Sequence, residues 1–519
     1  MRTKIRIAAA ALALAYVGYS QWRAHHAPPA STSAAATATS PAKAAPPAPP
    51  LMFGKIAFHP CTLSAPLVHD GVEAQCGSLS VPENSAQPTG RRIDLNIAWV
   101  QANDSSDAAS DAVFFLAGGP GQAAVATFPQ VAPAFQRVLQ KRNVILVDQR
   151  GTGKSNLLAC DLGDDDADSA ETDAPGKVES ATRGCVDALA KKADLTQYGT
   201  TQAVADLDAV REALGIAKVD LVGVSYGTRV AQQYAMRHPD RTRAVVLDSV
   251  VPNTLYLGNI WARNLDDALA LQFGVCSRDA KCAATLGDPR KELQSLMATL
   301  RAKPPMVTYA DPATGVQKTA PLTPADVAGL VRMFAYMPVM SSLLPLQIHE
   351  ANQGRYATLK SMADLLHASM KDAMAMGMQM SVICAEDGDH MTQSAPGNDG
   401  TLLGNGLTDA MARMCSVWPK GAVPADFHAA LATRVPTLVL EGEFDPVTPP
   451  RYGEEVVKTL PAGRLLVLKG QGHNVIGVGC MPKLFASFIE TADAKALDAK
   501  CLDTLGYTPP FTSFTGWTP

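Results

Sequence analysis

The sequence predicts an α/β fold in which a large, mainly helical cap insertion divides a mostly parallel central sheet into two parts. Between Arg91 and Val250, apolar β-rich runs alternate with helical stretches, as they do in chains of βα units. Several of these runs are short and almost wholly apolar, which is typical of strands buried on both faces of a parallel sheet. After Val251, long segments rich in Ala, Leu and Met replace them and predict the cap.

The strands fall into two groups along the chain. We expect them at residues 93–100, 113–116, 144–147, 219–224, 244–247, 437–440 and 465–468. The first part of the core would then cover residues 51–251, the helical cap 252–433 and the second part of the core 434–505. Residues 506–519 would form a tail.

The N-terminal segment predicts export. Three basic residues, Arg2, Lys4 and Arg6, precede an uncharged apolar run at 7–19. This run is shorter than the roughly 20 residues that cross a bilayer as a helix, so residues 1–26 are interpreted as a signal peptide. An uncleaved anchor, which would hold the protein at a membrane, is the alternative. Residues 27–50 are almost all Ala, Pro, Ser or Thr and predict an extended linker.

Cysteine usage is consistent with an oxidising compartment, either periplasmic or secreted. The chain has ten cysteines and no CxxC pair, so we expect five disulfides between sequential neighbours rather than a zinc or thioredoxin-like site. The pairs would be Cys61 with Cys76, Cys160 with Cys185, Cys276 with Cys282, Cys384 with Cys415, and Cys480 with Cys501. Spacing alone does not fix this pairing, and buried free thiols in a cytosolic enzyme are the alternative.

Composition excludes several functional classes. The chain is 47% hydrophobic and 18% charged, which is typical of a soluble globular enzyme rather than a disordered chain. The net charge is −4, and Lys and Arg are scattered rather than gathered into a stripe. A nucleic-acid partner is therefore not expected.

The strongest chemical signal is the GVSYG motif at 223–227. It follows the apolar run VDLV and precedes a helical stretch, the context of a nucleophile elbow. In such a turn the oxygen of Ser225 stands clear of the backbone as a nucleophile, and the N–H of Tyr226 becomes an oxyanion donor. A chance match is the alternative, because the chain has 39 glycines.

Two further residues complete a predicted Ser-His-Asp triad. In this arrangement the acid and then the histidine follow the serine along the chain, each on a loop after a strand. Asp445 follows the run TLVL, and His473 follows the run LLVL. We expect His473 to take the proton from Ser225, while Asp445 orients the imidazole and stabilises its charged form.

Two glycine-containing segments have different interpretations. AGGPG at 117–121 follows the run VFFL and predicts the second oxyanion donor. Gly119 is the first candidate for this donor and Gly118 the second. An ordinary tight turn is the alternative. VDQRGTGKS at 147–155 ends like a phosphate-binding loop, but that motif needs glycine where this chain has Asp148. We therefore expect no nucleotide and no other cofactor.

Together, GGPGQ, DQRGTGKS, GVSYG, FDPVTP and GQGH resemble the proline iminopeptidase and tripeptidyl aminopeptidase group of α/β-hydrolases. The resemblance covers about Cys61 to Cys501, and DQRGxGxS is its most specific element. It implies an α/β-hydrolase fold with a TAP-like C-terminal region, and a serine exopeptidase whose partners are peptide substrates with a free N-terminus. The triad also serves carboxylesterases, so activity on small acyl esters is the alternative. A catalytically silent binding protein is a third.

The sequence departs from the family pattern in two places. Ala117 stands where many relatives have His before the glycine pair, and Gln122 stands where their loop has a further glycine. Members of the family hold the substrate's ammonium with acidic groups of the cap or its junction. The segment ICAED resembles that junction, which makes Glu386 and Asp387 candidate substrate-binding residues; a salt bridge between cap and core is the alternative.

Methionines and acidic residues form two further clusters. The methionines lie within the predicted cap and would either form a plastic pocket wall or, the favoured interpretation, pack between helices. They are Met333, Met337, Met340, Met362, Met370, Met374, Met376, Met378 and Met380. The acidic run at 161–173 is interpreted as a solvated loop, because it lacks the spacing of a calcium site, and no metal is expected elsewhere.

Overall fold

The computed structural model describes residues 49–515, except 67, 69, 105–110, 161–175, 372–373 and 392–396. The predicted signal peptide, nearly all of the linker and the whole acidic run lie outside the described residues, as does the side chain of Met370.

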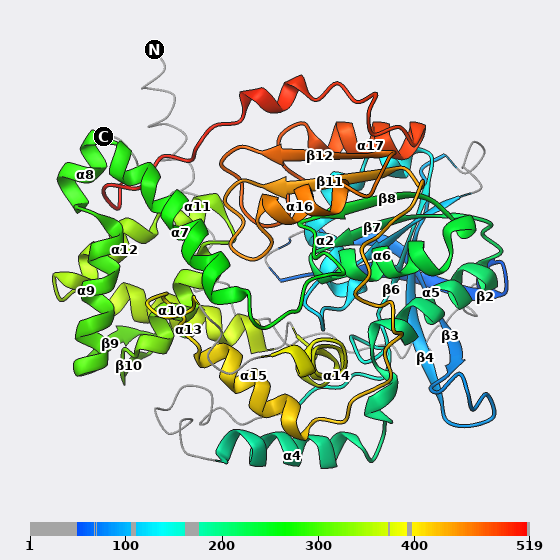
Figure 1. Cartoon of the computed structure of the whole chain (residues 1–519), viewed down its shortest axis with the longest axis horizontal. Coiled ribbons are helices and arrows are strands. Elements are labelled where there is room, and N and C mark those ends of the chain that lie inside the picture. The colour runs from blue at the N-terminus through cyan, green and yellow to red at the C-terminus, as the bar shows by residue number, and fades with distance from the viewer. Residues whose placement is uncertain are drawn as a thin grey trace, which may run out of the picture. The chain divides into compact units, whose positions relative to one another are not determined.

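Ten of the described strands form the central sheet seen in Figure 1, in the order β1-β2-β3-β4-β6-β5-β7-β8-β11-β12. Neighbours from β6 to β12 pair in parallel, and those from β1 to β6 pair antiparallel. Their bounds are β1 Leu51–Phe53, β2 Ile56–Leu63, β3 Val72–Pro82, β4 Arg92–Val100, β5 Ala112–Leu116, β6 Asn143–Val147, β7 Val219–Val224, β8 Thr242–Asp248, β11 Thr437–Gly442 and β12 Gly463–Leu468.

All the predicted strands are present, and the central parallel ones are buried as expected, whereas the edge strand β12 is partly exposed. Every residue of β5, β7 and β11 is buried. Strands β1 to β3 were not predicted. Along β2, buried and exposed residues are mixed, so its sequence lacks the apolar run that marks the central strands.

Helices cover both faces of the sheet and create a hydrophobic core on each. Successive side chains of a strand point to opposite faces. Phe114 accordingly packs with Leu207 and Val230, whereas Phe115 packs with Phe128 and Phe485. The core helices are α2 Ala124–Phe135, α4 Lys177–Leu189, α5 Thr200–Leu214, α6 Tyr226–Arg237, α16 Pro450–Val457 and α17 Met481–Thr491, with short 3₁₀ turns η1 Val138–Gln140, η3 Leu195–Gln197, η4 Pro239–Arg241 and η6 Lys500–Thr504.

Between β8 and β11 the described chain is mainly helical, as predicted, with one two-stranded hairpin. Its elements are α7 Trp261–Arg278, α8 Ala280–Leu286, α9 Pro289–Ala302, β9 Met306–Ala310, β10 Gln317–Pro321, α10 Pro324–Phe334, α11 Pro338–Ser341, α12 Leu344–Asn352, α13 Ala357–Lys371, α14 Met376–Glu386, η5 Gly388–His390 and α15 Gly406–Val417. Helices α7, α9, α10 and α12 share a hydrophobic cluster of their own, whereas α14 and α15 contribute to a cluster of the core. In Figure 1 the first four lie together at the left of the sheet. The insertion therefore has an outer cap and an inner pair of helices.

All ten cysteines are paired, in the five sequential pairs that the sequence suggested. The bridge between Cys384 and Cys415 joins the inner helices α14 and α15. Five disulfides indicate an exported or extracellular protein. Among the described helices, none has both the length and the apolar character needed to cross a membrane.

Candidate active site

Ser225 occupies a strained turn between β7 and α6. Its backbone has φ 55° and ψ −124°, a conformation that residues other than glycine rarely adopt. The flanking glycines make the turn possible, because a Cβ on Gly227 would lie 2.2 Å from the carbonyl oxygen of Leu116 and one on Gly223 would lie 2.4 Å from that of Gly227. Ser225 is half-buried between buried neighbours. The chain therefore forms the elbow that the motif predicts.

Asp445 and His473 meet on adjacent loops after β11 and β12. Nδ1 of His473 lies 2.7 Å from Oδ2 of Asp445. The other oxygen, Oδ1, accepts the N–H groups of Val447 and Thr448 at 2.8 Å each, and the Thr448 hydroxyl donates to Oδ2 at 2.9 Å. Asp445 is 1% exposed, so a fully hydrogen-bonded carboxylate holds one side of the imidazole.

Asp248 connects the turn at Ser225 (the serine turn) to the loop after β12 that carries His473 (the histidine loop). We did not predict this role. Its carbonyl oxygen accepts the N–H of Ser225 at 2.9 Å. Its carboxylate accepts the N–H groups of Val475 and Ile476 at 2.9 and 3.0 Å. Burial raises the pKa of Asp248 to about 6, against the opposing effect of these two backbone donors. Its position at the end of β8 was a usable signal, because carboxyl ends of parallel strands meet at one edge.

The glycine-rich loop after β5 lies beside Ser225. A Cβ on Gly118 would lie 3.1 Å from that of Ser225, so the two residues are in close contact. Gly119 has φ 108°, and a Cβ there would lie 2.9 Å from Cε of Met374, which comes from the segment before α14. The backbone of this segment binds the loop directly, because the N–H of Ala375 donates to the oxygen of Gly121 at 3.0 Å. Which loop N–H serves as the oxyanion donor stays a prediction.

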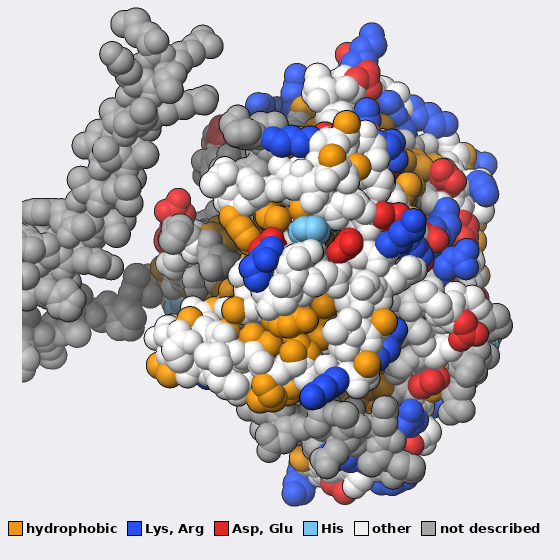
Figure 2. All heavy atoms as spheres, turned by 90° about the vertical axis from the view of Figure 1, so that its left-hand side faces the viewer, with side chains coloured by type: hydrophobic (Ala, Val, Ile, Leu, Met, Phe, Trp, Pro, Cys, Tyr) orange, Lys and Arg blue, Asp and Glu red, His pale blue; other side chains and the backbone are white. Residues whose placement is uncertain are grey.

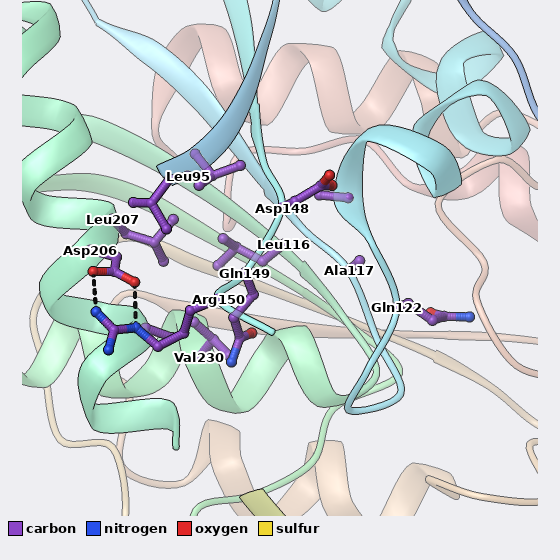
Figure 3. Close-up of a pocket in the computed structure, with 13 residues that line it drawn as sticks. Leu95, Leu116, Ala117, Gln122, Asp148, Gln149, Arg150, Asp206, Leu207 and Val230 are labelled. Carbon is purple, nitrogen blue, oxygen red and sulfur yellow. Dashed lines mark hydrogen bonds and ion pairs between the residues drawn. The ribbon is translucent and has the colours of Figure 1, made fainter. Parts of the chain in front are cut away.

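The cavity in Figure 3 is lined in part by this loop. Ala117 and Gln122 of the loop line it together with Asp148 and Arg150, and its volume is about 20 Å³. That is room for one water molecule, not for a substrate. Arg150 donates twice to the carboxylate of Asp206, at 2.6 Å each (Figure 3).

The DQRG segment therefore has its polar groups engaged within the fold. The Asp148 carboxylate accepts the N–H of Val125 at 2.9 Å and the side chain of Asn96 at 2.8 Å. Arg150 also donates to the carbonyl oxygens of Glu83 and Gln197. These contacts attach the segment to β4, α2 and α5. The absence of nucleotide binding stays a prediction.

Glu386 and Asp387 lie in a buried charge cluster around Arg229 of α6. The guanidinium donates to Oδ2 of Asp387 at 2.8 Å and lies 3.7 Å from Oε2 of Glu386. All three side chains are nearly inaccessible to solvent. Three polar atoms of this cluster have no hydrogen-bond partner, namely Oε2 of Glu386, Oδ1 of Asp387 and Nε of Arg229. The cap-to-core salt bridge is thus present, and both carboxylates keep an acceptor unused.

A short hydrogen-bond chain connects this cluster to the residue after the nucleophile. The N–H of Thr200 donates to Oε1 of Glu386 at 2.7 Å, and its hydroxyl lies 2.6 Å from the phenol oxygen of Tyr226. The Gln149 side chain donates to the same phenol at 3.1 Å. Burial raises the pKa of Glu386 to about 7, with Arg229 acting in the opposite direction. No sequence signal pointed to Arg229 or Thr200, because their partners are far away in the chain.

The cap also contacts the histidine loop. The N–H of His473 donates to the carbonyl oxygen of Tyr336 at 2.9 Å, and the two rings pack edge to face with centroids 5.1 Å apart. A Cβ on Gly472 would lie 2.1 Å from that same oxygen, so the close approach requires glycine. The outer cap therefore rests on the loop that presents His473.

Most of the described methionines pack between helices, as favoured. Met378 and Met380 are buried in the core cluster, while Met340 and Met362 pack against the outer-cap cluster. Met374 differs, because it reaches the glycine-rich loop. Figure 2 faces the cap side and shows apolar side chains gathered into patches there. Large apolar residues exposed in the cap include Met306, Val316, Met337, Val339 and Leu365.

Comparison with known proteins agrees with this architecture. The family described as the alpha/beta hydrolase fold matches residues 111–281, and the family described as TAP-like protein matches residues 401–501. The chain has the α/β-hydrolase fold. This finding confirms the fold and the family that the motifs predicted.

Relatives of this α/β-hydrolase extend over most of its length. Serine protease Hip1 of Mycobacterium tuberculosis is 27% identical over 504 residues, covering 88% of this chain and 92% of that protein. Tripeptidyl aminopeptidase of Streptomyces lividans is 26% identical over 458 residues, covering 82% and 83%. The crystal structure of proline iminopeptidase from Mycobacterium smegmatis is 18% identical with a TM-score of 0.39, covering 81% of this chain and 100% of that one. The α/β-hydrolase described here is a serine hydrolase.

Proposed function

We propose that this α/β-hydrolase is an exported serine peptidase that cleaves peptide bonds near a free N-terminus, as prolyl or tripeptidyl aminopeptidases do. The observation that carries the catalytic part is the 2.7 Å contact between His473 and Asp445, on loops that follow the Ser225 turn in the order of this fold. The peptidase part is supported by the relatives, named as a serine protease and a tripeptidyl aminopeptidase.

In the proposed mechanism Nδ1–H of His473 donates to Asp445, which leaves Nε2 as the base. As the oxygen of Ser225 attacks the scissile carbonyl carbon, its proton passes to Nε2. The resulting oxyanion accepts the N–H groups of Tyr226 and Gly119. Collapse breaks the C–N bond, and Nε2 returns the proton to the leaving amine. Water then attacks the acyl-enzyme in the same way and restores Ser225.

Recognition of the N-terminus is assigned to the cluster around Arg229. The cluster holds two carboxyl groups, Glu386 and Asp387, beside the single guanidinium of Arg229, and each carboxyl has one oxygen that accepts no hydrogen bond. An ammonium group has three donors and one positive charge, so it would satisfy both oxygens and the charge. The Thr200–Tyr226 chain places Glu386 near the residue that follows the nucleophile.

The proposed compartment follows from the five disulfides and the basic, apolar N-terminal segment. We place the mature enzyme in the periplasm or outside the cell, with residues 1–26 serving as a cleaved signal or as an anchor. N-terminal sequencing of the mature protein distinguishes these two fates.

The test is a panel of chromogenic amides carrying one, two or three residues, each with a free or an acetylated N-terminus, beside a simple acyl ester. We expect cleavage confined to free N-termini, and its loss in Ser225→Ala with an unchanged melting temperature. Turnover of the ester without any amide cleavage would replace the peptidase with a carboxylesterase. Full activity of Ser225→Ala would overturn the mechanism.

A further inference from the structure

Gln122 is the one position of the glycine-rich loop, residues 118–122, that carries a polar side chain. Its side-chain oxygen Oε1 and the Cβ of Ser225 each lie 3.1 Å from a common point, the position that a Cβ on Gly118 would occupy. The amide of Gln122 and the nucleophile therefore flank the same glycine. Gln122 is half-buried. Its backbone N–H donates to the carbonyl oxygen of Gly118 at 3.3 Å, and this hydrogen bond closes the turn of the loop.

The side-chain amide of Gln122 has no hydrogen-bond partner among the described residues. It points away from the buried ion pair of Arg150 and Asp206 (Figure 3). An amide presents two N–H donors on one end and a carbonyl on the other, and a rotation of its last bond exchanges them without moving the carbon chain. A donor can thus be turned toward the neighbourhood of Gly118 and Ser225 at little cost.

Negative charge develops in this neighbourhood when Ser225 attacks a carbonyl. Two backbone N–H groups are the usual donors for such an oxygen, and both are fixed by the fold. Because a carbonyl oxygen gains acceptor strength as it becomes an oxyanion, a third donor nearby stabilises the transition state more than the bound substrate. Where the family loop has a glycine, no side chain can supply that donor.

We propose that the side-chain amide of Gln122 is a third oxyanion donor, and hence a catalytic residue of this enzyme. The inference rests on the proposed role of Ser225 but not on the peptide specificity, because an acyl ester forms the same tetrahedral oxyanion. It accounts for a polar side chain left without a partner beside the nucleophile.

The test compares Gln122→Ala and Gln122→Glu with wild type, using an acyl ester and whichever amide the enzyme cleaves. Glu has the shape of Gln but no N–H when ionised. We expect both variants to lose about 100-fold in kcat with KM changed by less than about twofold. An aldehyde inhibitor, which forms a tetrahedral adduct with Ser225, should lose affinity by a similar factor.

A second readout separates donation from mere support of the loop. A thionoester places sulfur, a weak hydrogen-bond acceptor, where the oxyanion forms. The preference for the oxygen ester over the thionoester should therefore shrink in Gln122→Ala, which a structural defect alone would not produce. Gln130→Ala is the matched control, because Gln130 is an exposed glutamine of α2, the helix that follows the glycine-rich loop. This variant should behave as wild type.

Three results would overturn the proposal: an unchanged kcat in either variant, a loss confined to KM, or an unchanged preference between the two esters. If Gln122→Ala does not fold, the isosteric Gln122→Glu decides. Because Ser225→Ala is measured alongside, failure of the triad and failure of the Gln122 assignment give different results.

Discussion

Two of the buried carboxylate sites differ in how completely their oxygens are hydrogen-bonded. Asp445 receives four donors, two from backbone and two from side chains, and both of its oxygens are used. The pair Glu386 and Asp387 shares one guanidinium, and each has one oxygen that accepts no hydrogen bond although both side chains are buried. Burying an unpaired acceptor costs free energy, so such groups are uncommon in a folded protein.

The difference teaches that a fully hydrogen-bonded carboxylate and a carboxyl group with a free acceptor serve different tasks. A triad acid has to hold one imidazole in one orientation, and full hydrogen bonding achieves this. A site that binds a charged group has to keep acceptors available until the ligand arrives. The cost of the vacant oxygens is what an ammonium would relieve, which is how binding energy and specificity for a free N-terminus would arise together.

The largest expected effect comes from breaking the satisfied site. Asp445→Asn keeps the shape but places an NH₂ group where an oxygen accepted donors, so His473 loses its orienting acceptor. We expect kcat to fall roughly 10⁴-fold, the size expected for loss of a triad acid. Single-turnover kinetics measures this fall, and circular dichroism checks the fold. A loss of less than about tenfold would contradict the assignment of Asp445.

The next largest effect is on the free energy of unfolding and comes from the cluster of Glu386, Asp387 and Arg229. Asp387→Asn leaves Arg229 as a buried cation with the more distant Glu386 as its remaining carboxyl partner. Breaking a buried pair from one side typically costs ~3–5 kcal/mol in the free energy of unfolding. Urea unfolding measures the cost. Asp426→Asn removes the exposed partner of Arg237 and, as a control, should leave the unfolding midpoint unchanged. Equal midpoints for the two variants would contradict a buried charge cluster.

The two sites also differ in how far sequence alone could predict them. The triad residues each follow an apolar run within a few positions, so strand prediction and chain order suffice to bring Ser225, Asp445 and His473 to one edge of the sheet. The candidates Glu386 and Asp387 came from resemblance only. Their partner Arg229 sits in α6, 158 residues before Asp387, and such a contact leaves no local pattern.

The fold shows the same limit. Central strands contain short, nearly continuous apolar runs and were all predicted, whereas β1 to β3 have exposed positions that hide their period. The helical insertion was predicted as one cap. Its division into an outer cluster and the inner helices α14 and α15 depends on which apolar faces meet, and composition does not record that.

The pH dependence of stability tests the burial of Glu386 in the same cluster. Burial raises the pKa of Glu386 from its ordinary 4.5 to about 7. An acid with a raised pKa contributes stability that is complete below its ordinary value and is lost as the pH rises through 7. Wild type should therefore lose about 2–3 kcal/mol more between pH 5 and pH 8 than Glu386→Gln, which cannot ionise.

Urea unfolding of both proteins at the two pH values measures this difference, and the effects of other groups cancel in the comparison. Parallel pH profiles would show that Glu386 ionises as it does in water. The same variant should raise KM for substrates with a free N-terminus and leave ester turnover unchanged.

The smallest effect is expected at Asp248, which is satisfied like Asp445 but touches neither Ser225 nor His473 with its side chain. Its carboxylate accepts the N–H groups of Val475 and Ile476 just after the histidine loop. In Asp248→Asn one amide end must face a backbone donor, and the loop should shift by a few tenths of an ångström. We expect kcat to fall about tenfold, a cost of about 1.4 kcal/mol in the barrier, with KM nearly unchanged.

Asp220 provides the matched control, because it is as buried as Asp248. It lies near the start of the neighbouring strand β7, at the end opposite to Ser225, and pairs there with Arg243. Asp220→Asn should change stability and leave kcat as in wild type. If both variants lowered kcat alike, the effect would be a general response to a buried acid. A loss confined to Asp248→Asn would show that a satisfied carboxylate can act on catalysis purely by fixing a loop, without contacting the reacting groups.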